Sequence, residues 1–360
     1  MSLKHNFKLD LVSVKHILFF LGALLFSLLI NSIMLRFVKT LGIRNEGQAT
    51  IRWSSEVKPA LGGLTFYIIF LLSIIFHSFI FSYEGSNIDF KFTGIVGATS
   101  LGFLMGLSDD AYNTRPVLKF ITQVLCGVIL IYSGTYINIF ESDLLNYFLT
   151  ILWVVGLMNS INMLDNMDGI TTIVSLIVSF SILVLMLISN DTGTVGTTIV
   201  IGLLASLLGF LYFNWNPAKM YMGDTGSQYL GVLLAALSIS YLWNPVTTSE
   251  FAISRQLLIP LLCFIVPIVD TTTVTIKRLS KGNSPFIGGK DHTTHHLAYL
   301  GFSEKQVAAI VALISIISSS IAIYAITSIK SWNHWYTALA SAYFLIVFVV
   351  LFSIAKKNIK

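Results

Sequence analysis

The sequence is poor in charged residues. Of its 360 residues, 11% are Asp, Glu, Lys or Arg, whereas 55% are hydrophobic. Soluble domains carry about 25% charged residues, so this composition excludes a protein whose whole surface faces water. Apolar runs of roughly 18 residues or more can cross a bilayer, and the chain contains many such runs. The sequence therefore predicts an all-α, polytopic integral membrane protein.

Cysteine is scarce as well, with 2 residues in the chain. Cys126 and Cys263 lie in apolar runs far apart in the sequence, which argues against a disulfide framework and favours buried thiols. A cleavable signal peptide is not expected, because the first apolar run is long enough to span and no small-residue cleavage site follows it. Without a repeat or a soluble insertion, residues 1–360 are predicted to form one multi-span domain.

About eleven transmembrane helices are predicted, and ten to twelve are compatible with the pattern because three of the runs are short. The predicted spans are 17–38, 61–82, 92–108, 117–134, 144–163, 169–189, 194–213, 228–243, 256–276, 305–328 and 334–355.

Basic residues are distributed unevenly between the loops. If the loop after the first span is cytoplasmic, the cytoplasmic side holds 16 of the 22 Lys and Arg residues, as the positive-inside rule requires. Lysines of the N-terminal segment oppose the rule but are outnumbered. The loops 39–60, 109–116, 214–227 and 277–304 are then all cytoplasmic, and we expect them to form an active site together.

The first polar motif is the pair Asp109 and Asp110, followed by Lys119. Adjacent carboxylates repel each other, so such a pair at a membrane edge needs a cation, a proton or a metal nearby. Pro116 suits the first turn of the next helix, which places Lys119 just inside that helix. A solvated turn capped by aspartate is the alternative interpretation.

A second motif repeats polar side chains every three residues, at Asn159, Asn162, Asp165 and Asp168. This spacing aligns them along one face of a helix or its end. Two amides and two carboxylates on one stripe between apolar spans are costly to bury without a polar ligand. A structural polar seam between helices is the alternative.

The third motif, 214–227, contains Asn214, Tyr221 and Asp224, with glycines on both sides of the aspartate. Glycines let the backbone approach a ligand, and a helix N-terminus offers free N–H groups to phosphate. Asp224 supplies oxygen ligands of the kind that Mg²⁺ prefers. Tyr221 could stack on a base, although interfacial anchoring is the commoner use of such aromatics.

The loop 277–304 carries the fourth motif, which is basic and rich in histidine. Its residues of interest are Lys277, Arg278, Lys290, Asp291, His292, His295 and His296. A zinc site is one interpretation, but no cysteine is near and the other motifs offer oxygen ligands. Phosphate recognition by the imidazoles and Lys290 is favoured, with a plain surface loop as the alternative.

Together these motifs resemble the polyprenyl-phosphate N-acetylhexosamine-1-phosphate transferases, from Pro59-Ala60-Leu61-Gly62-Gly63 to the histidine loop. The stretches 159–169 and 214–227 are the most specific. The resemblance implies transfer of N-acetylhexosamine 1-phosphate from a UDP-sugar to undecaprenyl phosphate, with release of UMP, at the cytoplasmic face of a bacterial membrane. The product would begin a lipid-linked cell-envelope glycan. No nucleic-acid partner is implied, and a homodimer stays open.

The sequence of the histidine loop, Asp-His-Thr-Thr-His-His, resembles the GlcNAc-1-phosphate transferase branch of the family more than the phospho-muramoyl-pentapeptide transferase branch. The resemblance also implies residue roles. It places Asp109 and Asp110 beside the lipid phosphate, and Asp224 on Mg²⁺ (or Mn²⁺) with Asn162 near the metal. It places Asn159, Asp165 and Asp168 along the nucleotide-sugar pocket, Asn214 and Tyr221 on uracil, and His292, His295 and His296 on the sugar phosphates. Lys119, Lys277 and Arg278 are expected to hold phosphate charge.

Three mechanistic and functional alternatives accompany this prediction. Direct attack of the lipid phosphate is favoured over an aspartyl-phosphate route, because a phosphate is already ionised at neutral pH. A secondary transporter would place its charges near the bilayer midplane, where Asp270 is the one clear carboxylate. A CDP-alcohol phosphotransferase would need a tightly spaced aspartate-glycine-arginine signature that the chain lacks.

Overall fold

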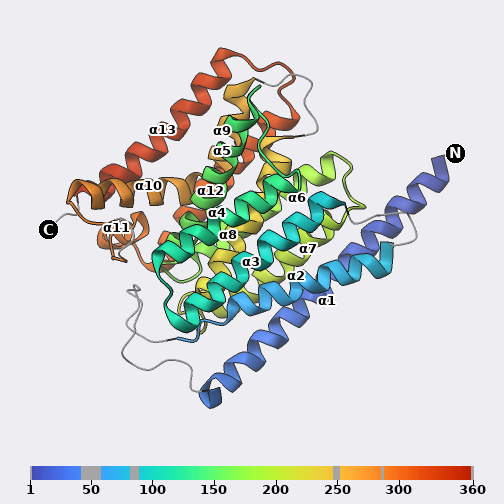
Figure 1. Cartoon of the computed structure of the whole chain (residues 1–360), viewed down its shortest axis with the longest axis horizontal. Helices are drawn as coiled ribbons and strands as arrows, with labels where there is room; N and C mark the ends of the chain where they lie inside the picture. Colours follow the sequence, from blue (N-terminus) through green and yellow to red (C-terminus); the bar gives the residue numbers. More distant parts are fainter. Residues whose placement is uncertain (1, 42–57, 82–88, 246–251, 285–287, 358–360) are drawn as a thin grey trace.

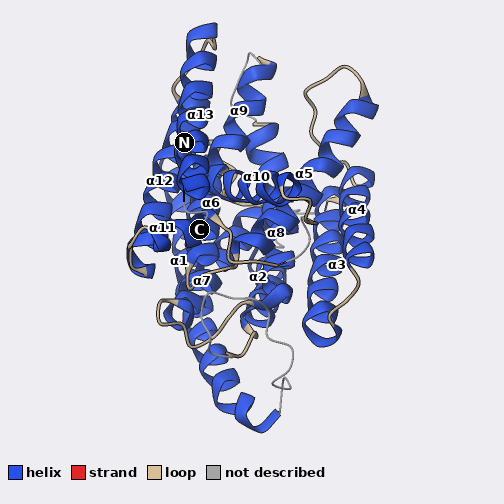
Figure 2. Cartoon of the chain, turned by 90° about the vertical axis from the view of Figure 1, so that its left-hand side faces the viewer, coloured by secondary structure: helices blue, strands red, loops and turns tan. Residues whose placement is uncertain are grey.

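The computed structural model describes residues 2–41, 58–81, 89–245, 252–284 and 288–357. Most of the predicted loop 39–60 and Pro285, Phe286 and Ile287 of the histidine loop lie outside these ranges. Within them the secondary structure is helical without a strand, as Figure 2 shows. The predicted all-α class is confirmed.

The helices appear in this order: α1 (Ser2–Leu41), α2 (Gly62–Phe81), α3 (Phe90–Tyr112), α4 (Pro116–Tyr132), α5 (Asp143–Leu164), α6 (Ile170–Ile188), α7 (Val195–Asn214), α8 (Gly223–Ser238), the π-helix η2 (Ile239–Trp243), α9 (Ile253–Cys263), α10 (Ile265–Ser280), α11 (Thr293–Tyr299), α12 (Glu304–Thr327) and α13 (His334–Lys357).

Each predicted span coincides with a helix or a pair of helices. Among the described residues, 8 helices are long and apolar enough to cross a membrane, or 9 if a bent pair counts as one span. The segments 117–134 and 228–243 fall on α4 and α8, which have 17 and 16 residues and are too short for that criterion. The chain is therefore a multi-span membrane protein, while the number of eleven crossings stays a prediction.

Helix α8 forms the centre of the bundle. Its residues from Thr225 to Ser238 are all buried, and it packs against α2, α3 and α5. Glycines permit this close packing, because a Cβ at Gly102 or Gly106 of α3 would collide with α8. In Figure 1, α1 and α13 run along opposite edges of the bundle. A short helix thus occupies the position with the least access to lipid.

A sharp bend separates α9 from α10. The two helices meet at Phe264 with an angle of 84°, and Pro260 interrupts the helical hydrogen bonding of α9 just before the bend. Helix α10 packs against α11 and α13, and Figure 1 shows it crossing the general direction of the bundle near these two helices. This bend corrects the expectation of one continuous span over 256–276.

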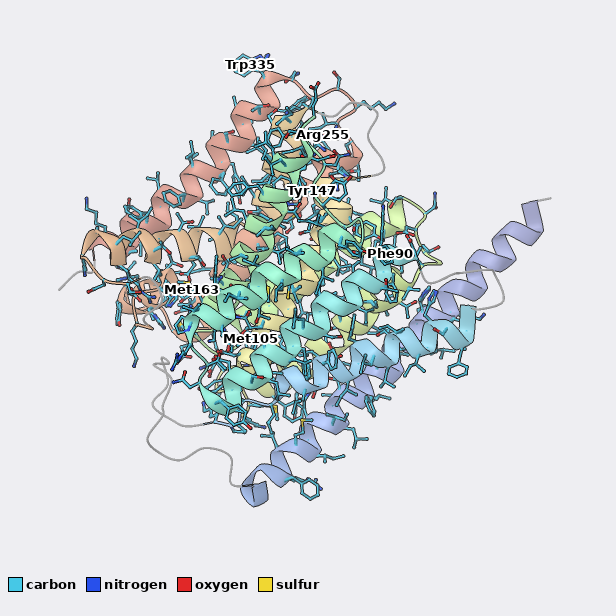
Figure 3. All side chains as sticks on the ribbon, viewed as in Figure 1. Phe90, Met105, Tyr147, Met163, Arg255 and Trp335 are labelled. Carbon is cyan, nitrogen blue, oxygen red and sulfur yellow. The ribbon has the colours of Figure 1, made fainter. Side chains whose placement is uncertain are left out.

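The carboxyl ends of α3 and α5 lie at the same end of the molecule. Figure 3 places Met105 of α3 and Met163 of α5 near each other at that end, with Phe90 and Tyr147 towards the other. The first three polar motifs lie at these ends or next to the N-terminus of α8, and the histidine motif lies on α10 and α11.

Candidate active site

Asp110 joins the end of α3 to the start of α8. Its Oδ1 accepts a hydrogen bond from the backbone N–H of Asp224 (3.1 Å), and its Oδ2 accepts from the backbone N–H and hydroxyl of Thr225 (2.9 and 2.7 Å). These N–H groups belong to the first turn of α8, which has no internal acceptors for them. Gly223, at φ 73°, leaves room for this carboxylate, because a Cβ there would collide with Asp110. Asp110 therefore caps α8 from another helix.

Its neighbour Asp109 has different partners. One carboxylate oxygen of this buried residue accepts hydrogen bonds from the backbone N–H and hydroxyl of Thr114 (2.8 and 2.6 Å). The other oxygen forms an ion pair with Lys119. Two adjacent aspartates on a helix point about 100° apart, so they serve separate elements.

Lys119 connects two carboxylates from different helices. Besides Asp109, its Nζ donates to Oδ2 of Asp224 at 3.0 Å. The side chains of Lys119 and Asp224 are 25% and 29% exposed, whereas that of Asp109 is 6% exposed. One ammonium thus offsets the repulsion between Asp109 and Asp224 at a position that solvent can reach.

Asn162 completes the surroundings of Asp224. Its Nδ2 donates to Oδ1 of Asp224 (2.9 Å) and to the hydroxyl of Ser227 (2.8 Å). Among the described residues, no group of three His, Cys, Asp or Glu side chains is arranged to hold a metal. The oxygens of Asp109 and Asp224, which already share a cation, are nevertheless the hard donors that Mg²⁺ selects. The donor set fits a magnesium ion that uses two carboxylates and ligands from a substrate.

The remaining members of the three-residue repeat diverge in role. Asp165 is half-buried at the C-terminal cap of α5. Asp168 is buried, and its Oδ2 accepts from the backbone N–H of Ala218 (2.8 Å) and from Asn216 (3.3 Å). Asn216 also donates to Glu304 at the start of α12 (2.9 Å). Asp168 therefore fixes the turn between α7 and α8, and Asn216 links this turn to α12.

Asn214 and Tyr221 frame this same turn. Asn214 is 2% exposed, accepts from the Thr172 hydroxyl (2.7 Å) and donates to the Met220 carbonyl (3.0 Å). Tyr221 pairs with Ala60 in an isolated parallel bridge, and Lys58 Nζ lies 5.7 Å from the centre of its ring. The amide of Asn214 is occupied within the protein, whereas Tyr221 carries a cation on its ring.

The histidine segment is anchored by Asp270, a fully buried carboxylate on α10. Asp270 accepts from the backbone N–H and hydroxyl of Thr293 (2.7 and 2.6 Å), and its other oxygen lies 2.7 Å from Nδ1 of His292. Thr294 donates to Asn166 of the turn after α5 (2.7 Å). The short helix α11 is thereby attached both to the bent span and to the end of the second motif.

Lys277 and His296 form the other attachment of α11. Lys277 Nζ lies 2.6 Å from Nε2 of His296 and donates to the carbonyl of Ala355 near the end of α13. Burial lowers the pKa of His296 to about 4, aided by the Lys277 ammonium, and burial also lowers the pKa of His295 to about 4. Both imidazoles are therefore neutral at neutral pH.

The two remaining basic candidates lie before α11. Arg278 holds Asp291 through two hydrogen bonds of 2.9 and 2.7 Å. Partial burial raises the pKa of Asp291, but the guanidinium of Arg278 outweighs this effect and leaves the pKa below its usual value. Lys290 is exposed, and its carbonyl accepts from the Tyr299 hydroxyl (3.2 Å).

The structure gathers the predicted residues unevenly. Asp109, Asp110, Lys119, Asn162 and Asp224 form one cluster, which we call the carboxylate cluster. Asn159 turns away from it to Gln123, donating to that amide at 2.8 Å. The sequence did not predict roles for Gln123, Asn216 or Asp270; for Asp270, a carboxylate inside an apolar span was the available signal.

Comparison with known proteins shows what the region around the carboxylate cluster is similar to. Residues 92–242 match the model of glycosyl transferase family 4. The chain is 28% identical over 350 residues to a probable undecaprenyl-phosphate N-acetylglucosaminyl 1-phosphate transferase of Bacillus subtilis, covering 95% of this chain and 92% of that protein.

Two further relatives match shorter stretches. A decaprenyl-phosphate N-acetylglucosaminephosphotransferase of Mycobacterium leprae is 28% identical over 284 residues, which cover 71% of this chain and 70% of that protein. A phospho-N-acetylmuramoyl-pentapeptide-transferase of Streptococcus agalactiae is 35% identical over 201 residues, covering 51% of this chain and 59% of the relative. Similarity to the N-acetylglucosamine enzymes therefore extends over more of the chain.

Proposed function

We propose that the chain transfers GlcNAc 1-phosphate from UDP-GlcNAc to undecaprenyl phosphate and releases UMP. The match of residues 92–242 to glycosyl transferase family 4 and the similarity to the Bacillus subtilis protein support this proposal. The product would be a lipid-linked sugar that starts a cell-envelope glycan. The length of similarity to the Bacillus subtilis protein favours this donor over a UDP-muramoyl-pentapeptide.

The observation that carries the proposal is the Lys119 bridge between Asp109 and Asp224. Two anionic substrates have to meet in this reaction, so the site needs cations and oxygen ligands within one small volume. The carboxylate cluster supplies both, at the N-terminus of α8, whose dipole favours negative charge.

In the proposed reaction, an oxygen of the lipid phosphate attacks the β-phosphorus of the UDP-sugar. The bond between that phosphorus and the bridging oxygen breaks, and UMP leaves with the bond electrons. Lys119 would hold the lipid phosphate and the developing charge. Asp109 would position the acceptor phosphate or take its remaining proton, whereas Asp110 would hold α8 in place.

Mg²⁺, or Mn²⁺ as an alternative, would be held by Asp224, and would polarise the diphosphate and stabilise the leaving UMP when bound. Asn162 orients Asp224 through its amide.

The other motifs would bind the donor. Tyr221 would stack on uracil, with Lys58 above its ring and Asp168 fixing its loop. Asp165 would lie along the same pocket. The histidine segment would meet the sugar phosphates with neutral imidazoles, which can donate hydrogen bonds without adding charge.

The proposed location is the cytoplasmic membrane of a bacterium, with the carboxylate cluster facing the cytoplasm. UDP-sugars are charged and polar, and the positive-inside bias supports this orientation for the loops that carry the site. The acceptor, undecaprenyl phosphate, is a membrane lipid and would reach the site from the surrounding bilayer.

The test is UMP release by purified protein supplied with undecaprenyl phosphate, Mg²⁺ and one UDP-sugar at a time. UDP-GlcNAc should support release, and Asp224→Ala should lower the rate by at least about 100-fold, because an electrostatic group at the reacting centre is lost. Asp143→Ala, which removes an exposed carboxylate at the opposite end of α5, is the matched control and should retain activity.

Three results would contradict the proposal. Release with UDP-muramoyl-pentapeptide and not with UDP-GlcNAc would change the substrate. A phospho-sugar adduct on Asp109 after incubation with the donor alone would replace direct attack by a covalent route. Uptake of the sugar nucleotide by vesicles without UMP release would indicate a transporter.

A further inference from the structure

Three helices that meet at the carboxylate cluster share a second polar position. On α4, α5 and α8 the cluster residues are Lys119, Asn162 and Asp224. One helical turn deeper in the bundle, the same helices carry Gln123, Asn159 and Gln228. Residues three or four apart lie on the same face of a helix, so each cluster residue has an amide side chain directly behind it.

These three amides bind one another, and we call them the amide triad. Gln123 and Asn159 exchange hydrogen bonds, with Asn159 Nδ2 donating to Gln123 Oε1 (2.8 Å) and Gln123 Nε2 donating to Asn159 Oδ1 (3.3 Å). Gln123 Nε2 also donates to Gln228 Oε1 (3.2 Å). Gln123 and Gln228 are each 1% exposed. One side chain of α4 is thus tied to two other helices.

Helix α4 is also attached to α3, because the buried Cys126 thiol donates a hydrogen bond to the carbonyl of Ala98 (3.4 Å). Its outer face is exposed and apolar, with Val117 at 67% and Leu118 at 51%, and a lipid-facing surface of this kind can slide or rotate against lipid at little cost. A hydrogen bond between side chains of two helices favours one register of those helices. The triad therefore adds directional contacts from α4 to α5 and α8, where Cys126 fixes α4 to α3 alone.

We propose that the amide triad is a positioning unit that sets the register of α4 against α5 and α8 and so holds Lys119 between Asp109 and Asp224. Gln123 is its central member, because both hydrogens of its amide and its oxygen are used within the triad. Gln228 contributes one acceptor, and its Nε2 has no partner among the described residues.

The variants Gln123→Leu and Gln228→Leu test this unit in the UMP-release assay, and this arm rests on the proposed function. Because Lys119 would no longer be held in place, Gln123→Leu should lower kcat by roughly tenfold, which is about 1.4 kcal/mol in activation free energy, with little change in KM for the UDP-sugar. Gln228→Leu should lower kcat less, because it also removes an unpartnered donor.

Gln256→Leu is the matched control, since Gln256 is a buried glutamine that donates to the Trp243 carbonyl (3.1 Å) at the other end of α8 and η2. It should change kcat by less than about twofold, as expected for a site remote from the cluster. Exchanging the pair as Gln123→Asn with Asn159→Gln should recover activity that each single change loses. Equal losses in Gln256→Leu and Gln123→Leu, or no recovery in the exchanged pair, would overturn the proposal.

A second measurement needs no activity. Spin labels at Val117→Cys on α4 and Tyr212→Cys on α7, both exposed sites, report the position of α4 in a background without Cys126 and Cys263. Gln123→Leu should shift or broaden the distance distribution by about 1.5 Å or more, the rise of one helical residue, and Gln256→Leu should not. An unchanged distance distribution in Gln123→Leu would refute the positioning role of the triad. A wild type that releases no UMP would refute only the proposed function, because the distance measurement does not depend on activity.

Discussion

Lys119 extends from the first turn of α4 into a pair of carboxylates that belong to two other helices. Its ammonium offsets the repulsion between Asp109 and Asp224, which could not both remain ionised so close together without a cation. His296 illustrates the opposite case, in which burial beside the Lys277 ammonium disfavours the protonated ring. At the scale of single residues, the environment thus assigns a charged form to some groups and a neutral form to others.

The histidines lead to a prediction about pH. The pKa values of His295 and His296 are about 4 in the folded protein and 6.5 for unperturbed histidine. Because folding favours the neutral form, the stability contributed by these rings is present above pH 6.5 and is lost as pH falls towards 4. The melting temperature in detergent should therefore drop over this interval.

Part of this drop should disappear in His295→Gln, which cannot gain the proton. His334→Gln is the control, because His334 is exposed at the start of α13, and its melting profile should follow that of the wild type. If the profiles of His295→Gln and wild type are parallel between pH 6.5 and pH 4, the neutral histidine assignment is wrong.

Helix α8 is short, wholly buried along most of its length and capped by a side chain from α3. Its first turn would otherwise expose unsatisfied N–H groups at the edge of a membrane protein core, which is costly. Helix α11 is held in a similar manner by Asp270 of α10, by Asn166 after α5 and by the contact of Lys277 with His296. At the scale of elements, buried side chains from neighbouring helices fix the two elements that carry the site.

The two adjacent aspartates should respond differently to replacement. Asp110→Ala removes three hydrogen bonds to the start of α8 and should lower the free energy of unfolding by about 2 kcal/mol, seen as a lower melting temperature. Asp89→Ala is the control, because Asp89 caps α3 at an exposed position and its loss should cost about 1 kcal/mol or less. A melting temperature for Asp110→Ala at or above that of Asp89→Ala would show that the cap contributes little.

The whole molecule brings its site together from segments spread over most of the chain. Lys119 and Asp224 are separated by 105 residues, and Asp110 and Thr225 by 115. Figure 3 shows Met105 and Met163 at one end of the bundle and Trp335 far from them. The molecule therefore has two different ends, and the distribution of basic residues predicts that the end with the site faces the cytoplasm.

Orientation can be measured by labelling with an impermeant maleimide. Lys219→Cys, in the exposed turn before α8, should be protected in intact cells and labelled in inverted vesicles, and Ser331→Cys, between α12 and α13, should give the reverse. Background should be low because Cys126 and Cys263 are buried. Labelling of Lys219→Cys in intact cells would place the carboxylate cluster outside and contradict the proposed function.

The sequence by itself determined the helical membrane class and the place of most helices along the chain, because long apolar runs can only be satisfied by helices in lipid. It also identified the four polar motifs, since charged side chains are rare in such a chain and each needs a reason to be there. The resemblance to the polyprenyl-phosphate N-acetylhexosamine-1-phosphate transferases depends on the spacing within 159–169 and 214–227, which is a local property of the sequence.

Only the tertiary structure decided how these residues are divided between tasks. It separated Asp109, paired with Lys119, from Asp110, which caps α8; it turned Asn159 towards Gln123 and Asn214 into the protein interior; and it bent the span over 256–276. The physical reason is that each of these outcomes depends on hydrogen bonds or packing between distant segments. Spacing along one helix shows which side chains share a face, but not which partner that face meets.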